Sequence, residues 1–410
     1  MKSKILALLG STLLTGTAMA GGYQVNLASQ RQIGMGHTGT GLQTGTSSIF
    51  FNPGAMAQAR NGVTIGASFI TSKIAYQAPE TNTTVNADNP TGTPFHAYGV
   101  FGITDKLKAG IGAYTPFGST VRWGDEWNGR FGLNELSLQA IFVQPTLSYQ
   151  LTDKLGIGAG LTVAFGSVNL QRSLPVENSN GDEGKIELDG GANTAFGFNA
   201  GIFFQATDKL SLGLNYRSKV DLEVEEGDVT FTNVPAAASA NFQPGTQFSA
   251  ALPMPATLTL GISYTPTNKL TLALDISRVE WSAYKELRFD FTKDVAGRPN
   301  SVNARNYEDT YIFRLGGEYK VNDALALRAG AYLDKTPVED GYLTPETPDA
   351  DSRGLSVGIG YAFSEKFGVD ASFLYINKKE RTDAANLSGG VPGTFKSIAY
   401  IPGVAFNYNF

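Results

Sequence analysis

The stretch LSYQLTDKLGIGAGLTVAFG, residues 147–166, decides the fold because it joins two alternating segments through a short polar turn. After the turn, large apolar and small side chains alternate along the chain. The large set is Leu155, Ile157, Ala159, Leu161, Val163 and Phe165, and the small set is Gly156, Gly158, Gly160, Thr162, Ala164 and Gly166. A period of two indicates a β-strand. A soluble sandwich would carry charged side chains on its outer face, so the nearly uncharged small face raises the question of which face meets water.

The composition favours a β-protein that does not face water on all sides. Only 17% of the 410 residues are charged, against about 25% in average globular proteins. No run of about 18 apolar residues follows the first twenty positions, which excludes a helical membrane protein. The net charge of −5 and the lack of a basic stripe argue against nucleic acid as a partner. Without cysteine there are no disulfides and no thiolate metal sites.

The N-terminus resembles a secretory signal peptide. Lys2 and Lys4 precede the apolar stretch ILALLGSTLL, and the Ala18-Met19-Ala20 triplet fits a cleavage signal. We expect residues 1–20 to be removed after Ala20, so that the exported chain begins at Gly21.

A short polar turn recurs along the chain. It reads TDKL at 104, 152 and 207, TNKL at 267, NDAL at 322 and SEKF at 364. Longer segments rich in Pro, Asp, Asn and Gly lie between these copies, so short turns alternate with long loops. The six turns join twelve strands, and one further strand lies at each end, Gly62 to Tyr76 and Ser397 to Phe410. The pattern predicts fourteen strands.

An even number of antiparallel strands with short turns at one end and long loops at the other is typical of an outer-membrane barrel. We therefore expect an all-β protein, a 14-stranded antiparallel transmembrane β-barrel over residues 62–410, in the outer membrane of a Gram-negative cell. The large apolar face would meet lipid and the small face would line the lumen. A secreted propeller would need more polar outer faces. The terminal Phe410 resembles the signal that the outer-membrane assembly machinery recognises, so we expect that machinery as a partner.

The segment before the first strand, residues 21–61, shows no sustained alternation and is rich in Gly, Thr and Ser. A barrel of fourteen strands is wider than the roughly eight strands whose interior side chains can fill. We predict that this segment forms an N-terminal plug, or hatch, in the lumen.

Several segments carry a specific resemblance in this order along the chain. They are GGYQVNLASQRQIGMGHTGTG at 21, SSIFFNPGAM at 47, NYRSKVDLEVEEG at 215, ALPMPATLTLGISY at 251, VEWSAYKELRF at 279, YEDTYIFRLGGEYKVNDALALRAGAYLDKTPV at 307 and the closing FNYNF. Together they resemble the FadL family of outer-membrane transporters of long-chain fatty acids and hydrophobic compounds, which includes TodX-like aromatic hydrocarbon transporters. In the hatch turn Asn52, Pro53 and Gly54, glycine stands where the family usually has alanine.

The resemblance implies a passive transporter that is not an enzyme and uses no cofactor or metal. Hydrophobic small molecules, long-chain fatty acids before aromatic hydrocarbons, would enter the plugged barrel and leave sideways through its wall. Tyr23 and Val25 would form apolar wall of the ligand site, and a basic residue after Trp281, here Arg288, would bind the ligand. Membrane lipid and lipopolysaccharide would surround the barrel, which we expect to be a monomer.

Strand parity marks a candidate ligand site independently. Beyond the glycines, the inward positions of the same strand become Val168, Leu170 and Arg172. Apolar positions that end in a cation suit an acyl chain with a carboxylate, whereas a porin would place opposed charges there. Arg288 is also expected to turn inward, after a bulge. Two alternatives stay open, namely that Arg172 lies at the solvated rim, or that these cations brace the hatch.

Two prolines mark a predicted lateral opening. Pro116 and Pro145 lie in consecutive predicted strands, and proline has no N–H to donate to a ladder. A closed barrel has no edge, and unpaired backbone groups facing hydrocarbon are costly. We therefore predict an exit beside Tyr114 to Gly118, where members of the family have a kinked strand. The alternative is a pair of bulges without a gap.

Further patterns in the sequence do not favour catalysis. The two histidines, His37 and His96, cannot form a zinc site alone and suggest no catalytic triad, so an outer-membrane lipase or protease is kept only as the enzyme-class hypothesis. The acidic loop 336–352 could hold Ca²⁺, although it meets no known ligand spacing. A structural or adhesive barrel and a general porin are two further hypotheses, and the sequence does not identify the substrate.

Overall fold

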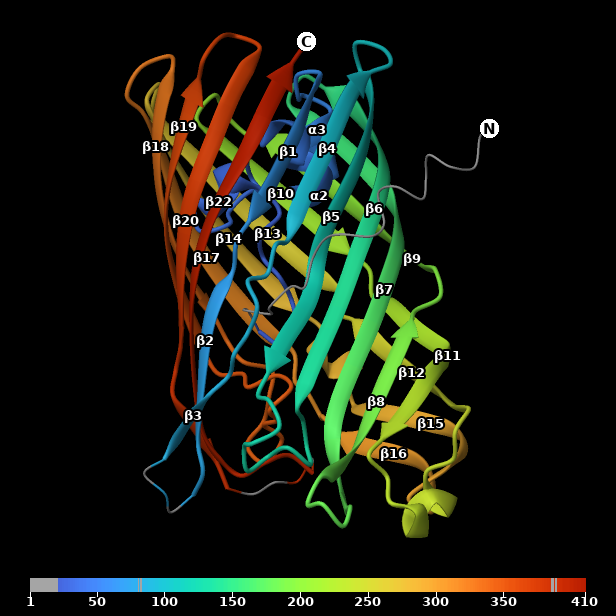
Figure 1. Ribbon diagram of the computed structural model, residues 1–410. Coiled ribbons are helices and arrows are strands. Elements are labelled where there is room, and N and C mark those ends of the chain that lie inside the picture. The colour runs from blue at the N-terminus through green and yellow to red at the C-terminus, as the bar shows by residue number, and fades with distance from the viewer. Residues whose placement is uncertain (1–20, 80, 82, 385–386, 388) are drawn as a thin grey trace.

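The computed structural model describes residues 21–79, 81, 83–384, 387 and 389–410 of the chain. These residues form a closed antiparallel β-barrel of fourteen strands, which confirms the predicted fold class (Figure 1). The predicted signal peptide, residues 1–20, lies outside the described residues.

The barrel wall closes because the first strand pairs with the last, from Gly62 opposite Asn409 to Ser68 opposite Gly403. Several barrel strands consist of two segments. The wall begins with β1 (Gly62–Ser68) and β2 (Thr71–Gln77), β4 (Phe95–Gly102), β5 (Leu107–Arg122), β6 (Glu135–Thr152), β7 (Leu155–Glu177), β8 (Glu183–Gly191) and β9 (Ala195–Gln205), and β10 (Leu210–Arg217) and β11 (Val220–Thr232). It continues with β12 (Thr246–Met254) and β13 (Thr257–Thr267), β14 (Leu270–Val279) and β15 (Glu286–Val295), β16 (Arg298–Ala304) and β17 (Thr310–Lys320), β18 (Leu325–Asp334), β19 (Ser352–Ala362), β20 (Phe367–Lys378) and β22 (Gly393–Asn409).

The recurring polar turns form as predicted, and their first residue explains why. Each motif ends on the first residue of a strand, as when Leu107 begins β5 and Leu155 begins β7. The side-chain oxygen of the first motif residue accepts hydrogen bonds from two backbone N–H groups of the turn. These oxygens belong to Thr104, Thr152, Thr207, Thr267, Asn322 and Ser364, at N to O distances of 2.9 to 3.3 Å. Ser, Thr and Asn close turns locally in this way, so the motif fixes where each hairpin bends.

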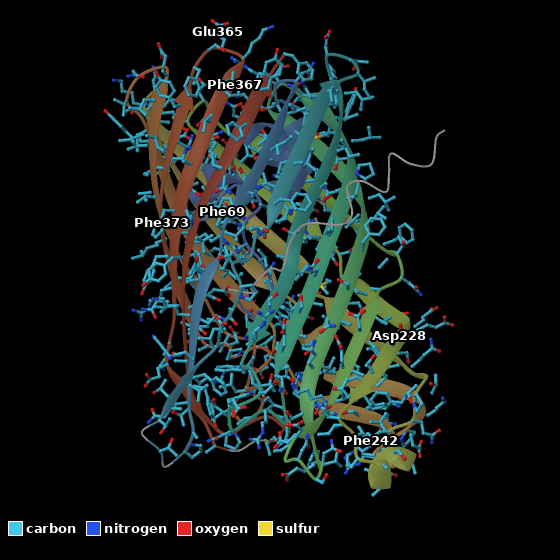
Figure 2. All side chains as sticks on the ribbon, in the orientation of Figure 1. Phe69, Asp228, Phe242, Glu365, Phe367 and Phe373 are labelled. Carbon is cyan, nitrogen blue, oxygen red and sulfur yellow. The ribbon has the colours of Figure 1, made fainter. Side chains whose placement is uncertain are left out.

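The two faces of β7 answer the question of which side meets water. Its large side chains lie outside the barrel, where Leu161 is 50% and Phe165 is 44% exposed. Exposed Leu, Ile, Phe and Tyr side chains continue around the wall, and Figure 2 labels Phe373 among them. An apolar exterior of this extent suits lipid and not water. Among the described residues, no helix is long and apolar enough to cross a membrane.

Residues 21–61 lie inside the barrel, where α2 and α3 are visible behind β1 and β4 (Figure 1). The short helices of this segment are α1 (Gln30–Ile33), η2 (Gly45–Ser47), α2 (Ser48–Phe51) and α3 (Pro53–Met56). Asp275 of β14 anchors the segment because its carboxylate accepts hydrogen bonds from the Gly39 and Thr40 N–H groups, at 2.9 and 3.0 Å. Arg31 binds Glu318 of β17 at 2.9 Å. The wall therefore holds the segment by charge as well as by packing.

At the loop end, β8, β11, β12, β15 and β16 form a tilted extended sheet that projects to one side of the barrel (Figure 1). The remaining elements lie in loops and breaks, and they are β3 (Thr84–Asn86), β21 (Arg381–Asp383), η3 (Ala236–Asn241) and η4 (Trp281–Ala283). The extended sheet matters for function because its inner face forms one side of the cavity described next.

Candidate ligand-binding site

The hatch turn packs directly on the glycine face of the barrel. The Asn52 side chain donates to the Thr40 and Ile202 carbonyls at 2.8 and 2.9 Å and accepts from the Gly54 N–H at 3.0 Å. A Cβ on Gly54 would lie 2.8 Å from the Gly156 carbonyl oxygen of the wall. Glycine in place of alanine therefore lets this turn approach the wall closely, as the inward Gly156 does from the other side.

Arg217 of β10 contacts both the hatch and strand β5. Its guanidinium lies over the Phe50 ring at 4.5 Å from the ring centroid and donates to the Phe50 carbonyl at 3.0 Å. It also donates to the Tyr114 hydroxyl, which in turn donates to the Gln144 side chain. Tyr114 is buried in this network, so its side chain points into the lumen, where its ring packs against Phe50 of the hatch.

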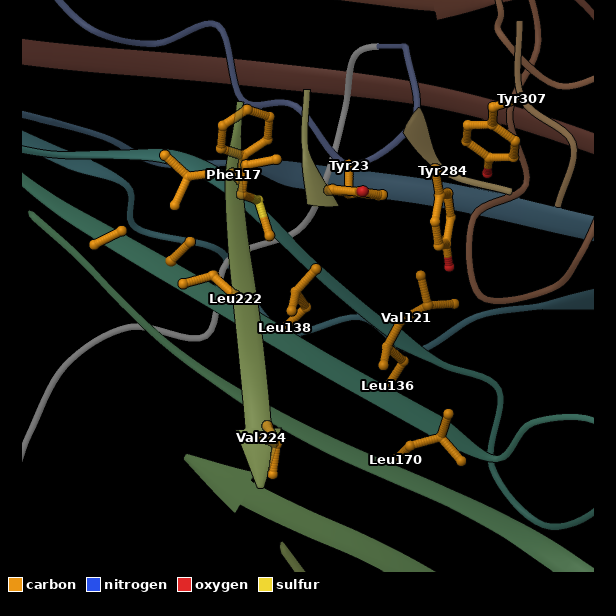
Figure 3. Close-up of a cluster of buried hydrophobic side chains, with 14 of the residues drawn as sticks. Tyr23, Phe117, Val121, Leu136, Leu138, Leu170, Leu222, Val224, Tyr284 and Tyr307 are labelled. Atoms are coloured by element: carbon orange, nitrogen blue, oxygen red, sulfur yellow. The ribbon is translucent and has the colours of Figure 1, made fainter. Parts of the chain in front are cut away.

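An apolar cavity lies between the hatch and the extended sheet. It holds about 750 Å³ of empty space, which includes open solvent. Tyr23 of the hatch forms one wall, and its ring packs against Trp281 and Tyr284. The barrel contributes Leu136, Leu138, Val168, Leu170, Leu222, Val224, Ala250, Leu252, Leu287 and Phe289. Figure 3 shows several of these side chains converging from different strands.

The cavity has one charged end, formed by loop residues. Arg305 and Glu346 line it, and the Arg305 guanidinium lies 3.4 Å from a Glu346 carboxylate oxygen and 3.4 Å from the Tyr284 hydroxyl. The Arg305 side chain is only 3% exposed. Burial lowers the pKa of Arg305, but Tyr284, Glu346 and Tyr307 outweigh that effect, so its pKa is raised above the usual value. This end of the cavity therefore carries the cation of Arg305, which forms one long salt bridge with Glu346.

A second cavity adjoins the first, with about 580 Å³ of empty space that includes open solvent. The two cavities share Leu170, Leu287, Phe289, Arg305 and Glu346. Arg172 lines this outer cavity, as do the loop residues Phe131 and Gly132. The predicted residues Val168, Leu170 and Arg172 therefore follow the cavities in order, with Arg172 at the outer one. The shared residues make the two cavities one path from the loops inward.

Arg288 does not turn inward, and the predicted orientation is wrong. Its side chain is 48% exposed and pairs with Asp290 at 2.8 Å. Its neighbours Leu287 and Phe289 line the cavity instead. The bulge expected before Arg288 would have reversed the inward face, but the odd-numbered positions stay buried on both sides of the break, as Val279 does in β14 and Phe289 in β15. β14 pairs with β17 from Leu270 to Val279 without a register shift, so the expected bulge is absent there.

Strand β5 is interrupted at Pro116. It pairs with β4 only from Lys108 to Tyr114, and its register with β6 shifts between Tyr114 and Phe117. Beyond Tyr114 the hatch takes the place of β4. The Val25 N–H donates to the Pro116 carbonyl at 2.7 Å, and the Gly118 N–H donates to the Tyr23 carbonyl at 3.0 Å. The hatch therefore completes the ladder at the place where the wall lacks a neighbouring strand.

A small cavity lies at this interruption, and we call it the β5 window. It has about 380 Å³ of empty space, which includes open solvent. Its lining consists of Val25, Ile70, Pro94, Thr115, Phe117, Gly118, Leu138, Gln139, Ala140 and Ile141. Leu138 also lines the main cavity, and Tyr23 packs on Phe117 at 6.1 Å between ring centroids. The hatch residue Val25 thus belongs to the window, whereas Tyr23 belongs to the main cavity.

Pro145 does not belong to the interruption, so this part of the prediction is wrong. It lies opposite Ile111, where the β5–β6 register is continuous. The β6–β7 register is also the same on both sides, with Val143 opposite Val163 and Thr146 opposite Gly160. The flanking pairs hold the strands together although one N–H donor is missing.

The sequence analysis did not identify Arg305, Leu222 and Val224 as residues of the cavity. The latter two could have been found, because they alternate with Asp221 and Glu223 in a period of two. Arg305 lies in a loop without periodicity and reaches the cavity only through the tertiary fold. No group of three or more His, Asp or Glu side chains is placed to hold a metal ion in the described part of the chain.

Comparison with known proteins agrees with this architecture. The model of the outer membrane protein transport family (OMPP1/FadL/TodX) matches residues 11–410. The chain is 26% identical over 433 residues to a 47 kDa outer membrane protein of Pasteurella multocida, with 98% of each chain covered. It is 22% identical over 440 residues to the long-chain fatty acid transport protein of Escherichia coli K12, with 97% of this chain and 96% of the relative covered.

Solved structures share the fold. A FadL homologue of Pseudomonas aeruginosa has a TM-score of 0.82 at 21% identity, covering 95% of this chain and 100% of that one. The toluene transporter TodX of P. putida has a TM-score of 0.71 at 19% identity, covering 97% of this chain and 99% of that one.

Proposed function

The chain belongs to the outer-membrane transport family (OMPP1/FadL/TodX) and is thus an outer-membrane transporter of hydrophobic substrates. On this premise we propose that it carries long-chain fatty acids and that these substrates leave through the barrel wall. The observation that carries the proposal is the shape of the main cavity, which is apolar along its body and has one buried cation, Arg305, at its end. An acyl chain would pack on the apolar body and its carboxylate would meet the guanidinium.

The proposed route has three steps. The substrate enters the outer cavity beside Arg172, moves past Leu170 into the main cavity, and leaves at the β5 window. Movement from the main cavity to the window requires Tyr23 and Phe117 to separate, because their rings pack together between the two. Tyr23 is a hatch residue, so a shift of the hatch would open the way.

We propose that residues 21–61 act as a hatch that blocks aqueous flow. The contacts of Asn52 and Gly54 with the wall, the salt bridge of Arg31 and the anchor on Asp275 support this role. Exit through the wall then lets a hydrophobic substrate avoid the polar hatch altogether.

Aromatic hydrocarbons are the second candidate substrate, and one observation favours them. Glu346 already lies beside Arg305, so the charged end of the cavity is neutralised without a ligand carboxylate. A neutral molecule would need only the apolar body.

The binding test fills the main cavity. Ala250 lines the cavity, and Ala250→Phe should abolish binding of a long-chain fatty acid to the detergent-solubilised protein by steric exclusion. The matched control is Ala159→Phe, because Ala159 faces outward on β7 and is exposed. Unchanged binding by a folded Ala250→Phe variant would contradict a ligand site in this cavity. Binding of toluene but not of the fatty acid by the wild type would favour the second candidate.

A further inference from the structure

A buried carboxylate without a cation of its own lies beside Gly21. Asp334, the last residue of β18, is 3% exposed. Its Oδ2 atom accepts a hydrogen bond from the Gly21 backbone nitrogen at 3.0 Å. Its Oδ1 atom has no hydrogen-bond partner among the residues that the structure describes. A buried carboxylate with one neutral donor is costly, because burial removes water without full compensation.

The neighbouring carboxylate, Asp349, is satisfied in contrast. Lys378 donates to it at 2.5 Å, Thr336 at 2.6 Å and the Gly22 N–H at 3.2 Å. Gly21 and Gly22 therefore lie between two carboxylates. Among the described residues, only Asp349 of the two forms a salt bridge.

The local charges leave one cation missing. The carboxylates of Asp275, Asp334 and Asp349 face the cations of Arg314 and Lys378. Arg314 donates to Ser277 and Asn26 at 2.8 and 3.2 Å, and Lys378 is held by Asp349. One further positive charge beside Asp334 would balance the group.

We propose that cleavage after Ala20 turns the Gly21 nitrogen into an α-ammonium group, and that this ammonium is the cation that binds Asp334. An ammonium carries three donors where a peptide N–H carries one, so both oxygens of Asp334 can accept. An α-amino group has a pKa of about 7.7 to 8.0 in model peptides, so it is charged at neutral pH. The site therefore binds the processed end of the chain itself.

The geometry around the terminus fits this role. A Cβ on Gly21 would lie 3.1 Å from Asp334 Oδ1, and a Cβ on Gly22 would lie 2.6 Å from the Trp281 ring. Gly22 also has a φ of +64°, a conformation that glycine adopts most readily. A side chain at position 22 would therefore clash with Trp281, and one at position 21 would crowd Asp334.

The ion pair has a consequence for the hatch. Tyr23, two residues along, lines the main cavity and bonds through its carbonyl to Gly118 at the β5 window. The ammonium would hold the outer end of the segment that bridges the window. A precursor that keeps its signal peptide would lack this charge, so the hatch would be fully seated only after processing.

The test measures the reactivity of the terminal amine in the whole protein, purified from outer membranes in detergent. Peptide mass spectrometry first establishes that the chain begins at Gly21. The folded protein is then pulse-labelled at pH 7 with an amine-acylating reagent. Pairing with Asp334 should raise the pKa of the amine by one unit or more, so acylation should be about tenfold slower in the wild type than in Asp334→Asn.

Two further variants make the result specific. Asp340→Asn removes an exposed carboxylate of the following loop and should react like the wild type. Inserting one alanine after Ala20 moves the ammonium by about 3.8 Å while Asp334 stays in place, and this variant should react like Asp334→Asn. Wild-type acylation as fast as in these two variants overturns the proposal. Slow acylation in Asp334→Asn overturns it too, because burial and not the carboxylate would then protect the amine.

Discussion

Replacing Arg305 with glutamine should weaken binding of a long-chain fatty acid much more than binding of its methyl ester. A hydrogen bond to a charged group contributes about 1.5 to 3 kcal/mol, which corresponds to a roughly 10- to 150-fold change in Kd. Glu346 already engages the guanidinium at 3.4 Å, so the ligand carboxylate would share this cation. We therefore expect the lower end of the range, about tenfold for the acid, and little change for the ester.

The design must separate ligand binding from stability. Removing Arg305 alone leaves the partly buried Glu346 carboxylate without its partner; breaking a fully buried pair costs about 3 to 5 kcal/mol of folding free energy, and we expect a smaller loss here. The double variant Arg305→Gln with Glu346→Gln removes both charges and should restore much of this loss. Kd is measured for acid and ester by calorimetric titration of folded protein in detergent. Equal losses for acid and ester, or no loss for the acid in either variant, would refute the role of Arg305.

Three further outcomes are expected. Gly54→Ala should destabilise the protein by about 1 to 3 kcal/mol in thermal unfolding, because its Cβ would lie 2.8 Å from wall backbone atoms, whereas Gly191→Ala, which meets no atom within 4 Å, should be neutral; equal midpoints would contradict the tight seating of the hatch. Arg288→Ala should leave the Kd for a fatty acid unchanged, since this exposed pair with Asp290 lies off the cavity, and a clear loss would reinstate Arg288 as a ligand residue. Deleting residues 21–43 should give steady ion conductance in planar bilayers where the wild type shows little, and a deleted barrel that stays closed would argue against a plug.

The barrel was predictable because its signals are local. A Thr, Asn or Ser at the first turn position bonds to the two N–H groups that it faces, as Thr152 does at the start of β7. The period of two then fixes which side chains meet lipid, as with Leu161 and Phe165. Neither signal depends on distant residues, so the sequence alone carries both.

The candidate site was only partly predictable because its signals are long-range. Parity along β7 pointed to Val168 and Leu170, and both line the main cavity. It failed at Arg288, because the large apolar side chains face outward in β14 but line the cavity in β15, while the odd-numbered positions stay inward in both strands. Pro116 and Pro145 both stand inside predicted strands and give the same signal in the sequence. Only Pro116 lies where β4 no longer pairs with β5. Which neighbour is missing is a property of the closed barrel and not of the strand.

The central claim is that substrate leaves through the β5 window, and a reversible cross-link tests it most directly. Pro94 and Thr115 both line the window, where the β4–β5 ladder ends, and Thr115 Oγ1 accepts from the Phe95 N–H at 3.1 Å. The chain has no cysteine, so Pro94→Cys with Thr115→Cys creates a single disulfide, with each single variant as control. Uptake of a labelled long-chain fatty acid by cells should be slow in the oxidised double variant and return to the wild-type rate on reduction. Uptake that is the same before and after reduction, with the disulfide confirmed by mass spectrometry, would contradict exit through the wall at this place.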